Sequence, residues 1–315
     1  MNVLGKLRHY IPYDGKVSVR VERWRRAARR MRHFGALRSS KYPWNAAAHS
    51  LRWSLASERS IETWTNDRLQ LAPHFWLFIA GCNNSGTTLL HHLLGSHPLV
   101  RALPREGQML TSALPTPTQL GLSRLFTKRL DVFRWTEETD AGPALRVKYD
   151  WARYFDQGPG ILLAKSPEDT LRTRWLQQNF SPSRFVVILR SPYAVSEGTR
   201  RRSGHSISDA AQHWLTTNEM LLNDLPHLQR HLLIRYEDFC EDPVQHLGRL
   251  QEFLDLEEPF SPAVVESCDV HNIDGRASGV RDFNAKSIAR LSRQELDEIN
   301  RIAAPLMERL GYDLL

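Results

Sequence analysis

The sequence predicts an α/β protein in which helices cover both faces of a mainly parallel β-sheet. Short apolar runs of strand length alternate with segments of helical periodicity, and the first run leads through a glycine-bounded loop into a helix. Of the 315 residues, 41% are hydrophobic and 24% are charged, which is ordinary for a globular protein. This composition excludes a disordered chain and a disulfide-stapled miniprotein.

Each strand is predicted from a run that is apolar throughout, as expected for strands buried on both faces. Residues 185–189 form the clearest run, because they are rich in β-branched side chains and uninterrupted. Helices are predicted from apolar residues at helical spacing, and Gly95 and Pro98 end the first of them. The predicted strands are 75–80, 161–164, 185–189 and 232–234, and the predicted helices are 89–94, 168–178, 210–222, 243–254 and 292–310.

Positive charge is concentrated at the start of the chain. Residues 1–41 contain twelve Lys or Arg and two Asp or Glu, a net charge of +10, whereas the whole chain carries +7. We therefore expect a basic extension over 1–70, irregular or weakly helical after 42, and an α/β domain over 71–315. A basic amphipathic helix within 16–38 would contact anionic lipid peripherally; a solvated arm is the alternative, and no specific nucleic-acid partner is expected.

Cysteine usage and hydropathy favour a soluble, cytoplasmic protein. The three cysteines, Cys82, Cys240 and Cys268, are far apart and form neither a CxxC motif nor a disulfide framework. No stretch approaches the ~20 apolar residues that a membrane span requires. The basic residues near the start are not followed by the apolar segment of a signal peptide.

The loop after the first predicted strand has the frame of a phosphate-binding loop. Gly81 and Gly86 are separated by four residues and followed by Thr87 and Thr88, so Thr87 stands where G-x-x-x-x-G-K-[ST] has lysine. Main-chain N–H groups and a helix N-terminus would converge on an anion there. The missing lysine disfavours an ATP or GTP hydrolase. A loop that only turns the chain is the alternative.

Ser85-Gly86-Thr87-Thr88 resembles the 5′-phosphosulfate loop of sulfotransferases, which use 3′-phosphoadenosine 5′-phosphosulfate (PAPS). The resemblance extends over about residues 74–313 and includes Lys165-Ser166-Pro167, the segment 185–192 and Trp214. It implies a P-loop NTPase-like three-layer architecture, PAPS as cosubstrate and no metal. It also implies sulfuryl transfer to a hydroxyl or amine of a glycan, lipid, tyrosine or small metabolite. Residues Asn83, Asn84, Ser85, Gly86, Thr87 and Thr88 are the expected loop contacts.

Two positions depart from the pattern of that family. The matching arginine, Arg190, would bind the 3′-phosphate, but the serine expected eight residues later is Gly198, and Ser196 is the nearest serine. Asn84 stands where the family usually has Lys or Arg. Lys165, at the end of a predicted strand, is the candidate for the missing cation, because such a charge stabilises the leaving group.

Glu106 is the candidate general base. It follows the loop by some twenty residues, a placement that resembles the glutamate-base branch of the family. A carboxylate can take the proton of a hydroxyl as its oxygen attacks sulfur. The alternatives are a salt bridge to Arg101 or Arg105, and a histidine base; the rival histidines are His91, His92 and His97.

The polar segment 271–283 resembles the part of the family that closes over the nucleotide. Arg281 is its best match for a 3′-phosphate ligand, with Arg276 and Lys286 as secondary candidates. We interpret 235–238, Arg-Tyr-Glu-Asp, as structural. The basic run 200–202 is interpreted as a solvated or acceptor-facing patch.

Two other functions remain open from the sequence: a P-loop kinase of small molecules and a non-catalytic nucleotide-binding relative. Asn84 and Gly198 favour the second of these. The irregular segment 111–160 would shape the acceptor pocket, and its pattern does not identify the acceptor.

Overall fold

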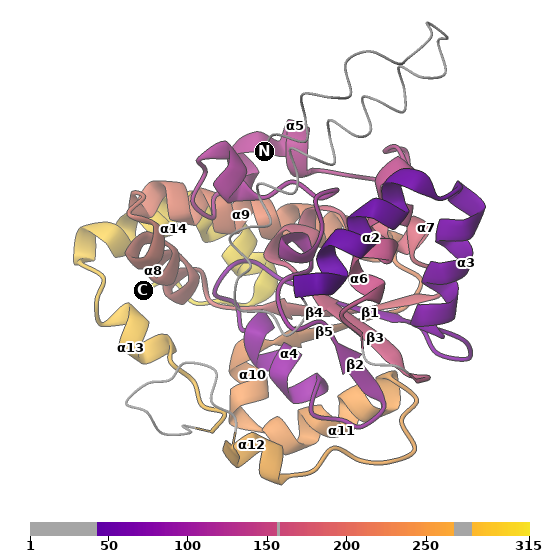
Figure 1. Ribbon diagram of the computed structural model, residues 1–315. Helices are drawn as coiled ribbons and strands as arrows, with labels where there is room; N and C mark the ends of the chain where they lie inside the picture. The colour runs from indigo at the N-terminus through magenta and orange to yellow at the C-terminus, as the bar shows by residue number, and fades with distance from the viewer. Residues whose placement is uncertain (1–42, 156–157, 268–278) are drawn as a thin grey trace, which may run out of the picture. The chain divides into compact units, whose positions relative to one another are not determined.

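The sheet has five strands, all parallel, in the order β2-β3-β1-β4-β5. The computed structural model describes residues 43–155, 158–267 and 279–315 (Figure 1). All four predicted strands are present, and the predicted fold class is confirmed. A fifth strand, β2, was not predicted, because three residues with a central arginine give no apolar run. The strands are β1 (Trp76–Ala80), β2 (Val100–Ala102), β3 (Ile161–Lys165), β4 (Ser183–Leu189) and β5 (His231–Arg235).

Helices cover both faces of the sheet and give it three layers (Figure 1). On one face Leu77, Ile79 and Val186 pack in a buried cluster with α4 (Thr87–Leu94), α10 (Tyr236–Glu241) and α11 (Pro243–Phe253). On the other face the rings of Trp76 and Phe78 both contact Phe180, which follows α7 (Thr173–Asn179). Trp76 also contacts Trp151 in α6 (Gly142–Ala152). Side chains alternate along β1, which is why its apolar run serves both cores.

A second helical group packs beside the carboxyl edge of the sheet. It consists of α8 (Pro192–Ser203), α9 (Ile207–Asp224) and α14 (Arg293–Leu310), which share a buried cluster that includes Trp214 and Ile299. α14 begins with a capping box between Ser292 and Glu295, and it ends at Gly311 in the left-handed conformation. The predicted helices 210–222, 243–254 and 292–310 correspond to α9, α11 and α14.

The remaining elements are short, apart from two helices near the start of the described chain. Residues 42–70, expected to be irregular or weakly helical, contain α2 (Pro43–Leu55) and α3 (Glu58–Leu69). The predicted helix 168–178 divides into a 3₁₀ turn and α7. The others are η3 (Gly107–Leu110), η4 (Pro117–Leu120), η5 (Phe126–Arg129), α5 (Leu130–Phe133), η6 (Pro167–Leu171), η7 (Leu225–His227), α12 (Ala263–Ser267) and α13 (Asn284–Ile288).

The chain divides into two compact units, Met1–Trp64 and Thr65–Leu315, and the site described below belongs to the second. The predicted basic arm, residues 16–38, lies outside the described residues, as do Cys268 and Arg276. Among the helices that the structure describes, none combines the length and the apolar character needed to cross a bilayer.

Candidate active site

The loop between β1 and α4, called the cradle below, presents main-chain N–H groups of a helix N-terminus at the carboxyl edge of the sheet. Gly86 has φ of 104° at the N-cap of α4, and a Cβ there would lie 2.9 Å from the Tyr236 ring. Glycine is therefore required both by conformation and by space. The next two residues, Thr87 and Thr88, form the first turn of α4, so their main-chain N–H groups have no partner within the helix.

The parallel register brings four strand ends to this loop. Ile79 pairs with Lys165, and Leu189 pairs with Arg235, so the residues that leave β1, β3, β4 and β5 meet at one edge. Lys165 is the last residue of β3, Arg190 follows β4 and Tyr236 follows β5. The ends of three parallel strands, of which β3 and most of β4 are buried, thus place these side chains around the cradle.

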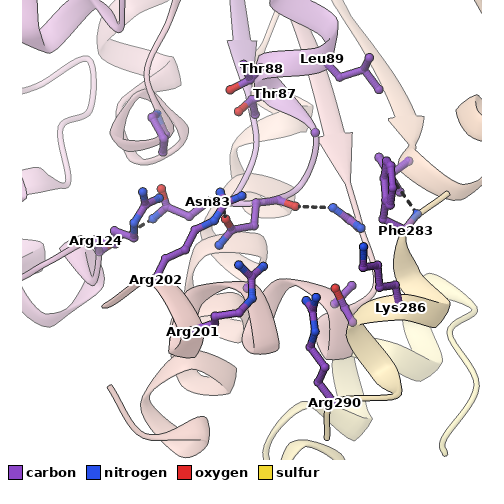
Figure 2. A pocket seen from close by; sticks show the side chains of 18 of the residues that line it. Asn83, Thr87, Thr88, Leu89, Arg124, Arg201, Arg202, Phe283, Lys286 and Arg290 are labelled. Atoms are coloured by element: carbon purple, nitrogen blue, oxygen red, sulfur yellow. Dashed lines mark hydrogen bonds between the residues drawn. The ribbon is translucent and has the colours of Figure 1, made fainter. Parts of the chain in front are cut away.

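A cavity of about 320 Å³ opens over the loop (Figure 2), and we call it the cationic cavity. Its charged lining comes from the loop edge, from α8, from the insertion after β2 and from the region of α13. Figure 2 shows the labelled arginines and Lys286 entering it from opposite sides, with Thr87 and Thr88 above. The lining includes Asn83, Asn84, Gly86, Thr87, Thr88, Glu106, Arg124, Arg190, Arg201, Arg202, Tyr236, Phe283, Lys286 and Arg290.

Arg190 is held against the loop itself. Its Nη1 donates to the main-chain oxygen of Asn84 at 2.9 Å, and its Nε donates to Oδ1 of Asn284 at 2.8 Å. The guanidinium carbon lies 3.9 Å from the centre of the Tyr236 ring, and the residue is only 7% exposed. Such a cation–π contact and two hydrogen bonds fix the fork in one orientation, with one guanidinium nitrogen bonded to the loop itself.

Lys165 and Glu106 meet beside the first turn of α4. Lys165 Nζ lies 3.1 Å from Oε1 of Glu106 and 3.2 Å from Oγ1 of Thr88. The lysine side chain is 7% exposed, whereas that of Glu106 is 28% exposed. Gln108 Nε2 donates to the other carboxylate oxygen at 3.0 Å. A buried cation and a partly accessible carboxylate therefore lie side by side against the first turn of α4.

The turn that carries Glu106 is fixed by two further segments. Glu106 is the N-cap residue of η3, and the indole of Trp151 in α6 donates to the oxygen of Gly107 at 2.9 Å. The N–H of Gln108 donates to Oγ of Ser166, directly after Lys165, at 3.3 Å. The segments that carry the base candidate and the lysine are thus linked by this hydrogen bond as well as by the contact between their side chains.

Cations outnumber carboxylates in the lining. Buried Glu197 accepts from Arg201 at 2.8 Å and lies 3.5 Å from Arg290. Arg124, Arg190, Arg202 and Lys286 have no carboxylate oxygen within 4.0 Å among the described residues. Burial, together with the charges of Arg124 and Arg201, lowers the pKa of Arg202. Like charges repel one another in this arrangement, so an anion would be attracted into the cavity.

Several sequence candidates are not part of the lining, among them Lys165, which contacts the lining residues Thr88 and Glu106. Ser85, within the loop, is fully buried, and Ser196 is buried within α8. Arg281 is exposed; its guanidinium lies 5.9 Å from the ring of Phe283, and it does not line the cavity. Shortly after the segment 271–283, Lys286, a secondary candidate, and Arg290 line the cavity instead.

The rival histidines are placed differently from Glu106. Burial and the charge of Lys165 lower the pKa of His91 to about 4, so its imidazole is neutral near pH 7. His97 is 5% exposed and contacts the main-chain oxygen of Glu258 at 3.0 Å. Neither they nor His92 line the cationic cavity, whereas Glu106 does.

Some lining residues were not predicted. Arg124 lies in the irregular insertion with φ of 82°, held by a hydrogen bond from Asn83 to its carbonyl oxygen at 2.9 Å. Tyr236 was interpreted as structural, yet its ring supports Arg190. Its position directly after a strand, at the edge where such sheets bind ligands, was the available signal. Of the run 200–202, Arg201 and Arg202 line the cavity, while Arg200 pairs with Glu295.

A sequence profile of the sulfotransferase family matches residues 77–262. Two curated proteins that carry the name protein-tyrosine sulfotransferase, from Caenorhabditis briggsae and Danio rerio, are 24% and 23% identical to this chain. Both alignments span 75% of this chain, and they span 89% and 72% of the two relatives. The solved sulfotransferase domain from the Synechococcus PCC 7002 olefin synthase superimposes with a TM-score of 0.52 at 23% identity, covering 76% of this chain and 95% of that domain.

Proposed function

Because the chain belongs to the sulfotransferase family, we propose that its cationic cavity binds PAPS and that Glu106 and Lys165 catalyse transfer of the sulfuryl group. The observation that carries this proposal is the contact of Lys165 with both Thr88 and Glu106. One cation there adjoins the anion cradle on one side and a candidate base on the other. Asn84 stands at the loop position where the family usually has Lys or Arg, and Lys165, the last residue of β3, supplies a positive charge in its place.

The cavity fits the charges of such a donor. The loop N–H groups and both threonine hydroxyls are suited to the 5′-phosphate, and Arg190 is suited to the 3′-phosphate. Phe283 and Tyr236 contribute aromatic faces to the same lining. The surplus of unpaired guanidinium and ammonium groups supports a ligand with several negative charges.

Each catalytic residue has one task in the proposed reaction. Glu106 accepts the proton of the acceptor hydroxyl while that oxygen forms a bond to sulfur. The bond from sulfur to the 5′-phosphate oxygen breaks, and Lys165 offsets the negative charge that develops on this oxygen. The products are the sulfated acceptor and adenosine 3′,5′-bisphosphate, with the proton left on Glu106. The printed names of the curated relatives make a tyrosine hydroxyl the first acceptor to test.

The proposal is tested by incubating the protein with PAPS and tyrosine-containing peptides, or with cell extract, and searching by mass spectrometry for products heavier by one sulfuryl group. Glu106→Gln should lower the transfer rate at least ~10²-fold, because the base is lost. Its affinity for adenosine 3′,5′-bisphosphate should stay unchanged. Glu241→Gln, the same substitution at an exposed site, serves as the control. An unaltered rate in Glu106→Gln would remove this residue from the mechanism.

A further inference from the structure

The side chain of Asn84 connects the phosphate loop to helix α8. Its Nδ2 donates to Oγ1 of Thr199 at 3.0 Å, and its Oδ1 accepts from Nη1 of Arg202 at 2.8 Å. The residue has φ of 65°, a conformation that asparagine adopts more readily than most side chains. The nitrogen and the oxygen of the amide are therefore both hydrogen-bonded, each to a residue of α8 that is distant in the sequence.

The Asn84 side chain packs directly against a glycine in α8. A Cβ at Gly198 would lie 3.2 Å from Cγ of Asn84, tighter than ordinary contact, and 3.4 Å from its Cβ and Nδ2. Any larger residue would press on the amide and on its two hydrogen bonds. Asn84 and Gly198, the two departures from the family pattern, are thus one packing arrangement.

Asn84 is also the point where two guanidinium groups meet the loop. Arg190 donates to its main-chain oxygen and Arg202 to its side-chain oxygen, and both arginines line the cationic cavity. A neutral amide holds Arg202 without cancelling its charge, as a carboxylate would. Figure 2 shows Arg202 extending from α8 to the loop beside Arg124 and Asn83.

We propose that Asn84 is a positioning residue: it holds Arg202 against the phosphate loop, so that a charge from α8 faces the anionic groups of the bound nucleotide. Gly198 leaves the space that the Asn84 side chain occupies. The inference rests on the proposed function, since it assumes the PAPS site. It adds that a second cation, besides Lys165, is held at the loop through a side-chain amide. Arg202 would then contribute a charge-assisted bond to the nucleotide phosphates.

The first test is calorimetric titration of adenosine 3′,5′-bisphosphate into the full chain. Asn84→Gly removes the amide without straining a positive φ, and it should weaken binding about tenfold or more, as expected for a lost charged contact. Gly198→Ala should weaken binding to a similar extent while the melting temperature does not fall greatly, because alanine favours a helix. Arg200→Ala, an arginine of the same helix that pairs with Glu295, is the matched control and should bind normally.

The double variant tests the coupling. In the Asn84→Gly background the space is free, so Gly198→Ala should cost no further affinity, and the two effects should be strongly non-additive. Equal costs of Gly198→Ala in both backgrounds would overturn the inference. Unchanged binding in Asn84→Gly would overturn it as well.

Asn84→Asp separates positioning from simple structural support. Aspartate can still accept from Arg202 and tolerates the same φ, so the melting temperature should hold, but the new carboxylate cancels the charge of Arg202. Binding should then be weaker than in Asn84→Gly, and a binding constant equal to that of the unaltered protein would contradict the inference. If the unaltered protein itself fails to bind the nucleotide, the proposed function fails instead, so the two failures are distinguishable.

Discussion

At the scale of single residues, a lysine and a glutamate from different segments lie side by side against the first turn of α4. Lys165 comes from the end of β3 and Glu106 from the turn before η3, and their charged atoms lie 3.1 Å apart. The lysine is nearly buried, so its charge acts in a medium of lower dielectric constant than water. The same contact would be of little consequence on an exposed surface.

Replacing Lys165 with methionine should lower the transfer rate by about 10²- to 10³-fold, because the charge that offsets the leaving group is lost. The affinity for adenosine 3′,5′-bisphosphate should fall less, since Arg190 and the loop N–H groups remain. Single-turnover rates with PAPS measure the effect. Lys128→Met, which removes an exposed lysine paired with Asp209, is the control. A rate loss explained wholly by weaker nucleotide binding would contradict this role.

Glu168 gives a pH-dependent prediction on stability. Burial raises its pKa to about 7 from an ordinary value of 4.5, and its Oε2 atom has no hydrogen-bond partner among the described residues. The folded state thus holds this proton more tightly than the unfolded chain does. The stability that the neutral group contributes is complete below pH 4.5 and is lost as the pH rises through 7.

Glu168→Gln, which stays neutral at every pH, should therefore unfold at higher denaturant concentration than the unaltered protein at about pH 8. The difference should shrink as the pH falls from 7 toward 4.5. Chemical denaturation of both proteins across this range measures it. A gap in the free energy of unfolding that is independent of pH would show that Glu168 does not titrate in this window.

At the scale of elements, the position of Glu106 depends on helix α6 rather than on its own turn. The turn η3 is four residues long, and Trp151 of α6 donates to the oxygen of Gly107 within it. A 3₁₀ turn of this length has weak hydrogen bonds of its own. The segment 111–160, which was too irregular to interpret, thus includes the helix that fixes the candidate base.

Trp151→Phe keeps most of the ring but leaves the buried oxygen of Gly107 without its donor, at a cost of ~1–3 kcal/mol. The turn should loosen, and the transfer rate should fall about tenfold or more while nucleotide affinity is kept. Trp135→Phe removes an equivalent bond, to the oxygen of Val132, at a site that does not line the cavity. If both variants lower the rate equally, the loss reflects general destabilisation and the argument for Trp151 fails.

Strands and strand ends were predictable because their causes are local. A run such as 185–189 is apolar on both faces, and a polar residue directly after it, Arg190, must lie at the carboxyl edge. The phosphate loop was predictable for the same reason, since its glycines and threonines are consecutive. β2 was missed because Val-Arg-Ala carries no comparable pattern.

At the scale of the whole molecule, the rest of the site arises from long-range packing. Arg124 and Arg290 lie in separate segments, and neither has a local pattern that indicates a ligand. They line one cavity only because the insertion after β2 and the region of α13 come together over the phosphate loop. Position 198 shows the same limit: its close contact with Asn84 spans more than a hundred residues and leaves no local signal.

The most direct test of the account is calorimetric titration of the full chain with adenosine 3′,5′-bisphosphate and with ATP in magnesium-free buffer. We predict that the bisphosphate binds more tightly than ATP, and that Arg190→Ala removes this preference because the guanidinium on the loop is lost. No detectable binding of the bisphosphate at millimolar concentration, or tight binding of ATP only when magnesium is added, would contradict it.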